Sequence, residues 1–312
     1  MHSIMIETRL IPLPHGISLS CRMAGEPGRP VLMFLHGFPE GAFVWDTLLA
    51  HFARPENGAY FCIAPNLRGF EKSSAPPEAD AYRPKHLMQD IAALVAAFCP
   101  ADRPQLECLV AHDWGGAIAW NLAAAMPQLM KKLAIINSPH PGTFLRELQH
   151  SPSQQAASAY MNFLIRPDAE ALLAKDDFRR LWQFLTNGSD QVPAWLTDSV
   201  RDQYREVWRA GLTGGCNLYR ASPLRPPRPG PPHNDPAAAA VTLARERLTV
   251  LLPTLVIWAL DDIALPPALI EGLADYVPDM QLRQVPGTSH WIVHEQPERV
   301  AGYLQDFLGQ VR

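Results

Sequence analysis

Hydrophobic residues along this chain form short unbroken runs that alternate with longer stretches in which they recur every three or four positions. Short runs bounded by turn residues are typical of strands buried on both faces, and the second spacing is typical of helices with one buried side. The runs predict strands at residues 31–35, 60–64, 106–111, 133–137 and 254–260. The spacing predicts helices at residues 87–98, 117–126 and 297–308. This alternation predicts an α/β fold with a mostly parallel central sheet that helices cover on both faces.

The alternation stops in the middle of the chain and resumes at residue 251. Between residues 143 and 247 we find helical, aromatic-rich segments at 156–164, 169–185 and 195–210 but no buried strand. We therefore predict a core domain made of residues 1–142 and 248–312, with a helical domain at 143–247 inserted into it.

The inserted domain includes a proline-rich segment at residues 222–236. Proline fixes φ and lacks a backbone donor, so this segment can be neither a helix nor a central strand. A stiff surface linker is the favoured interpretation, and a ligand for an SH3-type domain is the alternative.

The composition is that of an ordinary globular protein, with 47% hydrophobic and 19% charged residues. A formal net charge of −4 argues against a nucleic-acid-binding or membrane-surface protein. No apolar run is long enough to span a bilayer, and the first residues do not resemble a secretory signal. The five cysteines are odd in number and lack metal-ligand spacing, so we expect a cytoplasmic protein without disulfides, either a monomer or a homodimer.

The strand predicted at 106–111 runs directly into His112-Asp113-Trp114-Gly115-Gly116 and then into a helix. Small residues around a central nucleophile at a strand-to-helix turn are the pattern of a nucleophile elbow, because only small side chains let the backbones pass so closely. The central residue is Asp113, and a helix N-terminus favours its negative charge. An N-cap role for Asp113 is the alternative, but the preceding buried strand and the partners described below favour the nucleophile.

A second motif, His36-Gly37-Phe38-Pro39-Glu40, follows the strand predicted at 31–35. The loop at this place in such a sheet supplies a backbone donor to an oxyanion hole. By position the donors are the N–H groups of Phe38 and Trp114. Pro39 stiffens the loop, and we expect His36 chiefly to brace it.

Two further residues complete the order of nucleophile, acid and base along the chain. Asp262 follows the strand predicted at 254–260, with Asp261 as the alternative acid one residue earlier. His290 lies in a glycine-containing loop near the C-terminus. Either residue alone is a weak signal, whereas the order of all three is the one expected in this type of fold.

These motifs resemble the epoxide hydrolase and haloalkane dehalogenase branch of the α/β-hydrolases over nearly the whole chain. The segments that carry the resemblance are residues 36–45, 66–77 and 112–116. The resemblance implies an α/β-hydrolase fold with a helical cap. It also assigns the acid to Asp262, through the family's Gly/Ala-x-x-Asp pattern at Ala259, and the base to His290.

The resemblance also implies that two tyrosines of the cap hydrogen-bond the epoxide oxygen. Tyr160, seven residues before Pro167, and Tyr219, in a G-x-x-G-x-x-N-x-Y-R segment, lie in the corresponding motifs. Packed cap aromatics without a catalytic role are the alternative. The segment at 222–236 departs from the family and leaves the size of the substrate open.

The implied activity is hydrolysis of a small, largely apolar epoxide through an ester on Asp113, without a metal or organic cofactor. We expect His36, Pro39, Phe163 and Trp291 to border the substrate. Dehalogenation by the same nucleophile is the main alternative. It is disfavoured because Phe38 stands where such enzymes commonly have an asparagine, and Trp114 where fluoroacetate-type enzymes have an arginine. A non-catalytic binding protein on this fold is a third possibility.

Overall fold

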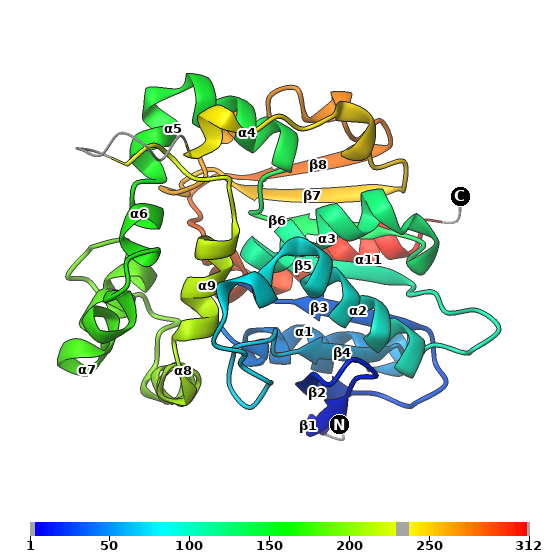
Figure 1. The fold of residues 1–312 in the computed structure, drawn as a ribbon. Helices are drawn as coiled ribbons and strands as arrows, with labels where there is room; N and C mark the ends of the chain where they lie inside the picture. The colour runs from blue at the N-terminus through cyan, green and yellow to red at the C-terminus, as the bar shows by residue number, and fades with distance from the viewer. Residues whose placement is uncertain (1–3, 229–236, 311–312) are drawn as a thin grey trace.

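The computed structural model describes residues 4–228 and 237–310. Its centre is an eight-stranded sheet in the order β1-β2-β4-β3-β5-β6-β7-β8 (Figure 1). The strands are β1 (Glu7–Pro12), β2 (Ser18–Ala24), β3 (Val31–Leu35), β4 (Phe61–Pro65), β5 (Cys108–His112), β6 (Leu133–Ile136), β7 (Thr254–Ala259) and β8 (Met280–Val285). β2 pairs antiparallel with β1 and β4, and all other pairs are parallel. The predicted mostly parallel sheet is therefore confirmed.

The strands that the hydrophobic pattern predicts are the fully buried ones, β3 to β7. The pattern does not predict β1, β2 and β8. β1 and β8 are the two edges of the sheet, and most of their residues are exposed or only partly buried. Edge strands bury too few side chains to produce a continuous apolar run.

Helices cover both faces of the sheet. α2 (Pro84–Phe98) packs beside α3 (Asp113–Ala125) on one face, and α1 (Asp46–Phe52) packs beside α11 (Pro297–Leu308) on the other (Figure 1). A short α10 (Ile292–Glu295) precedes α11. Within the described residues, no helix is both long and apolar enough to cross a membrane. All five cysteines are buried and free.

The described part of the stretch between β6 and β7 is mainly helical and contains no strand, as the sequence predicts. It contains α4 (Pro141–His150), α5 (Pro152–Ala157), α6 (Tyr160–Leu164), α7 (Ala169–Leu185), α8 (Asp198–Ala210) and α9 (Thr213–Ala221). α6 to α9 lie beyond one end of the sheet (Figure 1). Residues 222–228 of the proline-rich segment lack helix and strand, and its residues 229–236 lie outside the described part of the chain.

The turn from β5 into α3 brings its backbone into close contact with neighbouring segments. Asp113 adopts a φ of 50°, a left-handed conformation that costs about 1–3 kcal/mol in most side chains but that aspartate tolerates better than most. A Cβ at Gly115 would collide with the carbonyl oxygens of Leu35 and His36, and one at Gly116 with the Ser138 side chain. The glycines therefore let α3 begin in contact with the ends of β3 and β6.

Gly115→Ala should lower the free energy of unfolding by about 1–3 kcal/mol, because backbone atoms must move to admit the methyl group. Gly302→Ala is the matched control, since its Cβ would meet nothing within 4 Å in α11. It should raise stability by up to about 1 kcal/mol, because alanine favours helix. Chemical denaturation measures both variants, and equal stabilities would contradict this account of the junction.

Candidate active site

The Asp113 carboxylate is held by backbone donors on one side and faces a histidine on the other. The Phe38 N–H donates to Asp113 Oδ1 at 2.7 Å, and the Trp114 N–H also bonds the carboxylate. Asp113 Oδ2 lies 3.7 Å from His290 Nε2. Burial raises the pKa of Asp113, although the His290 charge and the two backbone donors oppose the rise. A Cβ at Gly37 would collide with this carboxylate, so the glycine is required for the approach.

Of the two candidate acids, Asp262 is the one that contacts His290. Its Oδ2 lies 2.6 Å from His290 Nδ1, and its Oδ1 accepts hydrogen bonds from the N–H groups of Ala264 and Leu265, both at 2.9 Å. Burial acts to raise the pKa of Asp262, but the His290 charge and these hydrogen bonds hold it below its usual value. The alternative acid, Asp261, has an exposed side chain.

His290 bridges the two carboxylates. Burial acts to lower its pKa, but the charges of Asp262 and Asp113 outweigh burial and raise the pKa to about 9. The imidazole is therefore protonated at neutral pH while both carboxylates are charged. Any event that neutralises Asp113 removes part of that stabilisation and favours the neutral ring.

Tyr160 at the start of α6 and Tyr219 on α9 lie near Asp113. Their ring centroids are 6.0 Å apart, and Tyr219 packs edge-on to Trp114 at 5.0 Å and to Phe38 at 5.5 Å. Burial raises the pKa of both hydroxyls, and the nearby Asp113 carboxylate raises it further. Both tyrosines therefore keep their protons and can act as donors.

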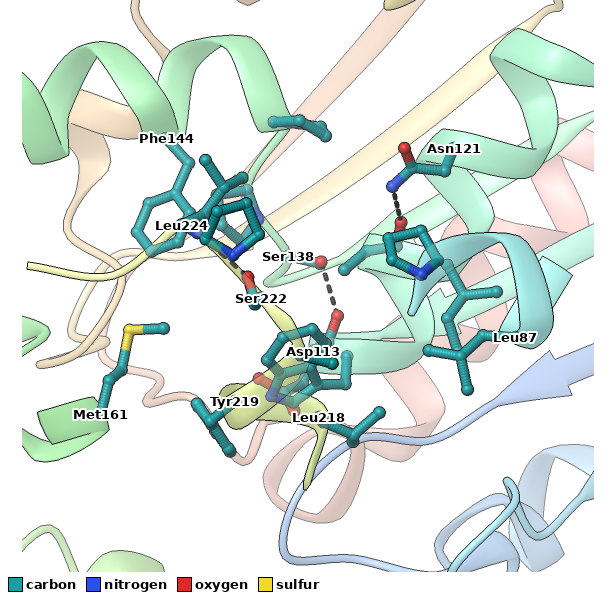
Figure 2. Close-up of a pocket in the computed structure, with 18 of the residues that line it drawn as sticks. Leu87, Asp113, Asn121, Ser138, Phe144, Met161, Leu218, Tyr219, Ser222 and Leu224 are labelled. Carbon is teal, nitrogen blue, oxygen red and sulfur yellow. Dashed lines mark hydrogen bonds between the residues drawn. The ribbon is translucent and has the colours of Figure 1, made fainter. Parts of the chain in front are cut away.

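Two cavities meet at these residues. The first, which we call the apolar cavity, has a volume of about 190 Å³ (Figure 2). The second, which we call the polar-rimmed cavity, has a volume of about 580 Å³. Asp113, Tyr160 and Tyr219 line both cavities, whereas Asp262 and His290 line only the second. Asp113 therefore lies at the junction of the two cavities.

The residues expected to border the substrate divide into two groups. Pro39, Phe163 and Trp291 line the polar-rimmed cavity. His36 lines neither cavity, which contradicts the expectation that it borders the substrate. Its Nδ1 lies 2.9 Å from the Gly37 carbonyl oxygen, and its Nε2 accepts from the Leu67 N–H at 3.1 Å. It braces its loop from a fully buried position.

The sequence analysis missed two residues that hydrogen-bond Asp262 and Asp113. Asn137, at the end of β6, donates through Nδ2 to Asp262 Oδ2 at 2.8 Å and accepts through Oδ1 from the Ala259 N–H at 2.8 Å. Ser138 donates through Oγ to the Asp113 carbonyl oxygen at 2.6 Å (Figure 2). Their position at the end of a predicted parallel strand is the signal that could have identified them.

Glu40 organises a buried polar cluster on the far side of His290. Its Oε2 lies 3.1 Å from His112 Nδ1, and His112 Nε2 lies 3.0 Å from the His290 carbonyl oxygen. Its Oε1 accepts from the Tyr204 hydroxyl at 3.0 Å and lies 3.3 Å from His294 Nε2. Burial acts to raise the pKa of Glu40, but the histidines hold it well below its usual value. The cluster thus connects α8 to the backbone of the base.

In the described residues, no group of three or more His, Cys, Asp or Glu side chains is arranged to hold a metal ion. The donors at the site are instead backbone N–H groups, two tyrosines and one histidine, around a single carboxylate that faces both cavities. This arrangement can deliver a carboxylate to an electrophilic carbon and stabilise a developing oxyanion on either side of it.

Asp113→Asn should lower the pKa of His290 below its value of about 9, by about one unit or more, because one of the two facing carboxylates loses its charge. Histidine-selective ¹H–¹⁵N NMR across a pH titration measures the change. Asp261→Asn removes an exposed carboxyl adjacent in sequence to the acid and should leave the titration unchanged. An unaltered His290 titration in Asp113→Asn would show that the two groups are not coupled.

Comparison with known proteins places this geometry in a family. The profile of the α/β hydrolase fold family matches residues 30–297. A Bacillus subtilis (strain 168) protein named AB hydrolase superfamily protein YfhM is 31% identical over 94% of this chain and 95% of its own length. Epoxide hydrolase 3 of Xenopus tropicalis is 30% identical over 94% of this chain and 75% of its own length.

One solved structure is 35% identical in sequence to this chain. It is described among novel epoxide hydrolases belonging to the α/β hydrolases superfamily in metagenomes from hot environments. The match covers 98% of this chain and 100% of that one, with a TM-score of 0.84. The chain is therefore a hydrolase of the α/β-hydrolase fold family, and the resemblance of its motifs to the epoxide hydrolases of that family is confirmed.

Proposed function

We propose that this protein hydrolyses a small, largely apolar epoxide to a vicinal diol through a covalent ester on Asp113. The observation that carries the proposal is that one carboxylate, Asp113, shares both cavities with two protonated tyrosines, of which Tyr219 is buried and Tyr160 partly buried. A carboxylate is a modest nucleophile that suits displacement at a saturated carbon, and hydroxyl donors suit the oxygen that leaves that carbon.

In the first step, Asp113 Oδ2 attacks a ring carbon of the epoxide. Oδ1 is engaged by the Phe38 N–H, and this leaves Oδ2 as the oxygen directed at the substrate. The C–O bond of the ring breaks, and its electron pair moves to the ring oxygen. The hydroxyls of Tyr160 and Tyr219 donate hydrogen bonds to that oxygen, which becomes an alcohol by taking the proton that His290 releases once the ester has formed.

In the second step, the His290 ring acts as a base. Formation of the ester removes the charge of Asp113, so the pKa of His290 falls and the ring can release its proton. The neutral ring, oriented by Asp262, takes a proton from water, which attacks the Asp113 carbonyl carbon. Charge develops on Oδ1, where the N–H groups of Phe38 and Trp114 stabilise it. The ester C–O bond then breaks, the leaving oxygen takes the proton from His290 as the diol is released, and the Asp113 carboxyl returns its remaining proton to the ring.

The helical insertion is the cap over this site. Residues 143–247 form the cap, and residues 1–142 and 248–312 form the hydrolase core. The cap supplies Tyr160 and Tyr219, and it is anchored to the loop that follows β3. The Trp208 indole of α8 donates to the Pro39 carbonyl oxygen at 2.7 Å, and Tyr204 donates to Glu40.

The same nucleophile could in principle displace a halide, but the surroundings favour an epoxide. Halide sites need donors aimed at the leaving atom. Position 38 holds an aromatic side chain packed against Tyr219, and the Trp114 indole bonds the Tyr219 hydroxyl. An intact set of nucleophile, acid and base also argues against a non-catalytic binding protein.

Single-turnover hydrolysis of styrene oxide in H₂¹⁸O tests the ester directly. The first-turnover diol should carry unlabelled oxygen, and mass spectrometry should find ¹⁸O in the peptide that contains Asp113. Asp113→Ala should abolish turnover, and His290→Gln should accumulate the alkyl–enzyme adduct, because it slows hydrolysis more than alkylation. Labelled oxygen in the first-turnover diol would refute the ester mechanism, and halide release from a bromoalkane without diol formation would indicate a dehalogenase.

Tyr160→Phe and Tyr219→Phe should each lower kcat/KM for styrene oxide by about 10- to 100-fold, because each removes one donor to the developing alkoxide. The double variant should lose considerably more than either single one. Tyr303→Phe, on α11 and away from both cavities, should match the wild type. Wild-type rates in both single variants and in the double variant would remove the tyrosines from the mechanism.

A further inference from the structure

The two cavities on either side of Asp113 differ in size and chemistry. The apolar cavity is walled by residues from the core, from α4 and α9, and from the start of the proline-rich segment, among them Leu87, Ile118, Phe144, Leu218, Leu224 and Leu248. A dry cavity of about 150 Å³ accepts a benzene ring, and sites for whole drug-sized ligands begin near 300 Å³. At about 190 Å³, the apolar cavity holds one short apolar substituent, not a complete substrate.

The proline-rich segment supplies part of this cavity. Ser222, Pro223 and Leu224 line it, and Leu224 also packs on a small cluster formed by Leu145, Leu148 and Ala238. Its backbone N–H donates to the Ser222 side chain at 3.2 Å, which fixes the first turn of the segment. The described part of the segment therefore forms part of the wall of the apolar cavity, a role that a surface linker would not have.

The polar-rimmed cavity is larger and has polar side chains among its lining residues. Its outer residues include Arg180, Gln183 and Asn187, all exposed on or just after α7. The Arg180 guanidinium lies 5.1 Å from the centroid of the Phe163 ring. Across the described ranges no carboxylate forms an ion pair with it, whereas its neighbour Arg179 pairs with Asp176 at 3.3 Å. A cation and two side-chain amides that line one cavity match the hydrogen-bonding needs of a carboxylate.

From this geometry we infer that the preferred substrate is an internal epoxide with two unlike arms. A short apolar arm occupies the apolar cavity, and the other arm ends in a carboxylate near Arg180 in the polar-rimmed cavity. The inference rests on the proposed epoxide hydrolysis, since it places the two ring carbons at Asp113, where the cavities meet. Arg180 and Leu224 are then the residues that determine specificity for the two arms.

Three epoxides test the two arms of the substrate separately, and styrene oxide tests epoxide hydrolysis itself. trans-7,8-Epoxydodecanoate has a butyl arm and a carboxylate arm, its primary amide lacks the charge, and 7,8-epoxyoctanoate lacks the butyl arm. The wild type should show kcat/KM for the first at least about 10-fold above that for the octanoate, because four buried methylene-sized groups favour binding. The kcat/KM of the wild type for the dodecanoate should also exceed that for its amide by about 3- to 5-fold, because an exposed ion pair contributes only a small binding free energy.

Variants assign each preference to its residue. Arg180→Gln should remove the difference between acid and amide, and Arg179→Gln, a change of the adjacent but paired arginine, should retain it. Leu224→Trp should remove the advantage of the butyl arm by filling the apolar cavity. Leu251→Trp, at a leucine that is 74% exposed and lines neither cavity, should retain that advantage.

The failures are distinguishable. If the wild type hydrolyses styrene oxide but handles the octanoate as well as the dodecanoate, or the amide as well as the acid, the two-armed substrate is wrong and the proposed function stands. Persistence of both preferences in Arg180→Gln and Leu224→Trp would likewise overturn the assignment of the cavities. If no epoxide yields a diol, the proposed function fails and this inference fails with it.

Discussion

The turn from β5 into α3 is the constraint on which the rest of the site depends. It holds Asp113 at a positive φ, with the carboxylate above the ends of the parallel strands. Gly37, Gly115 and Gly116 are required there, because a Cβ on any of them would collide with the backbone or side chains of the neighbouring segments. The close packing fixes the carboxylate against the Phe38 N–H, and so one of its two oxygens is committed to backbone donors.

The protonation of His290 depends on where this turn places the Asp113 carboxylate. Two carboxylates face the two ring nitrogens of His290, and their combined attraction outweighs burial, so the pKa of the base is raised. Asn137 and the backbone N–H groups of Ala264 and Leu265 stabilise the acid from behind. Because Asp113 is one of the two carboxylates that raise the pKa of His290, the protonation of the ring depends on the charge of Asp113.

The sequence alone determined the features that depend on local backbone chemistry and on order along the chain. Buried parallel strands need unbroken apolar runs, so β3 to β7 are predictable from the pattern. The nucleophile turn needs small residues around Asp113, and the acid and base follow it in a fixed order, so the motifs themselves point to Asp113, Asp262 and His290. Tyr160 and Tyr219 depend on the resemblance to a family, because an isolated tyrosine in a helix gives no local signal of its role.

The tertiary structure decided what depends on contacts between distant segments. It distinguished Asp262 from Asp261, because only Asp262 has its carboxylate beside the His290 ring. It moved His36 from the substrate to the support of its own loop. It also revealed Asn137 and the division of the site into two cavities. A one-dimensional pattern records which side of a strand or helix is buried, but not which remote side chain meets it, because that depends on how the sheet and the cap pack together.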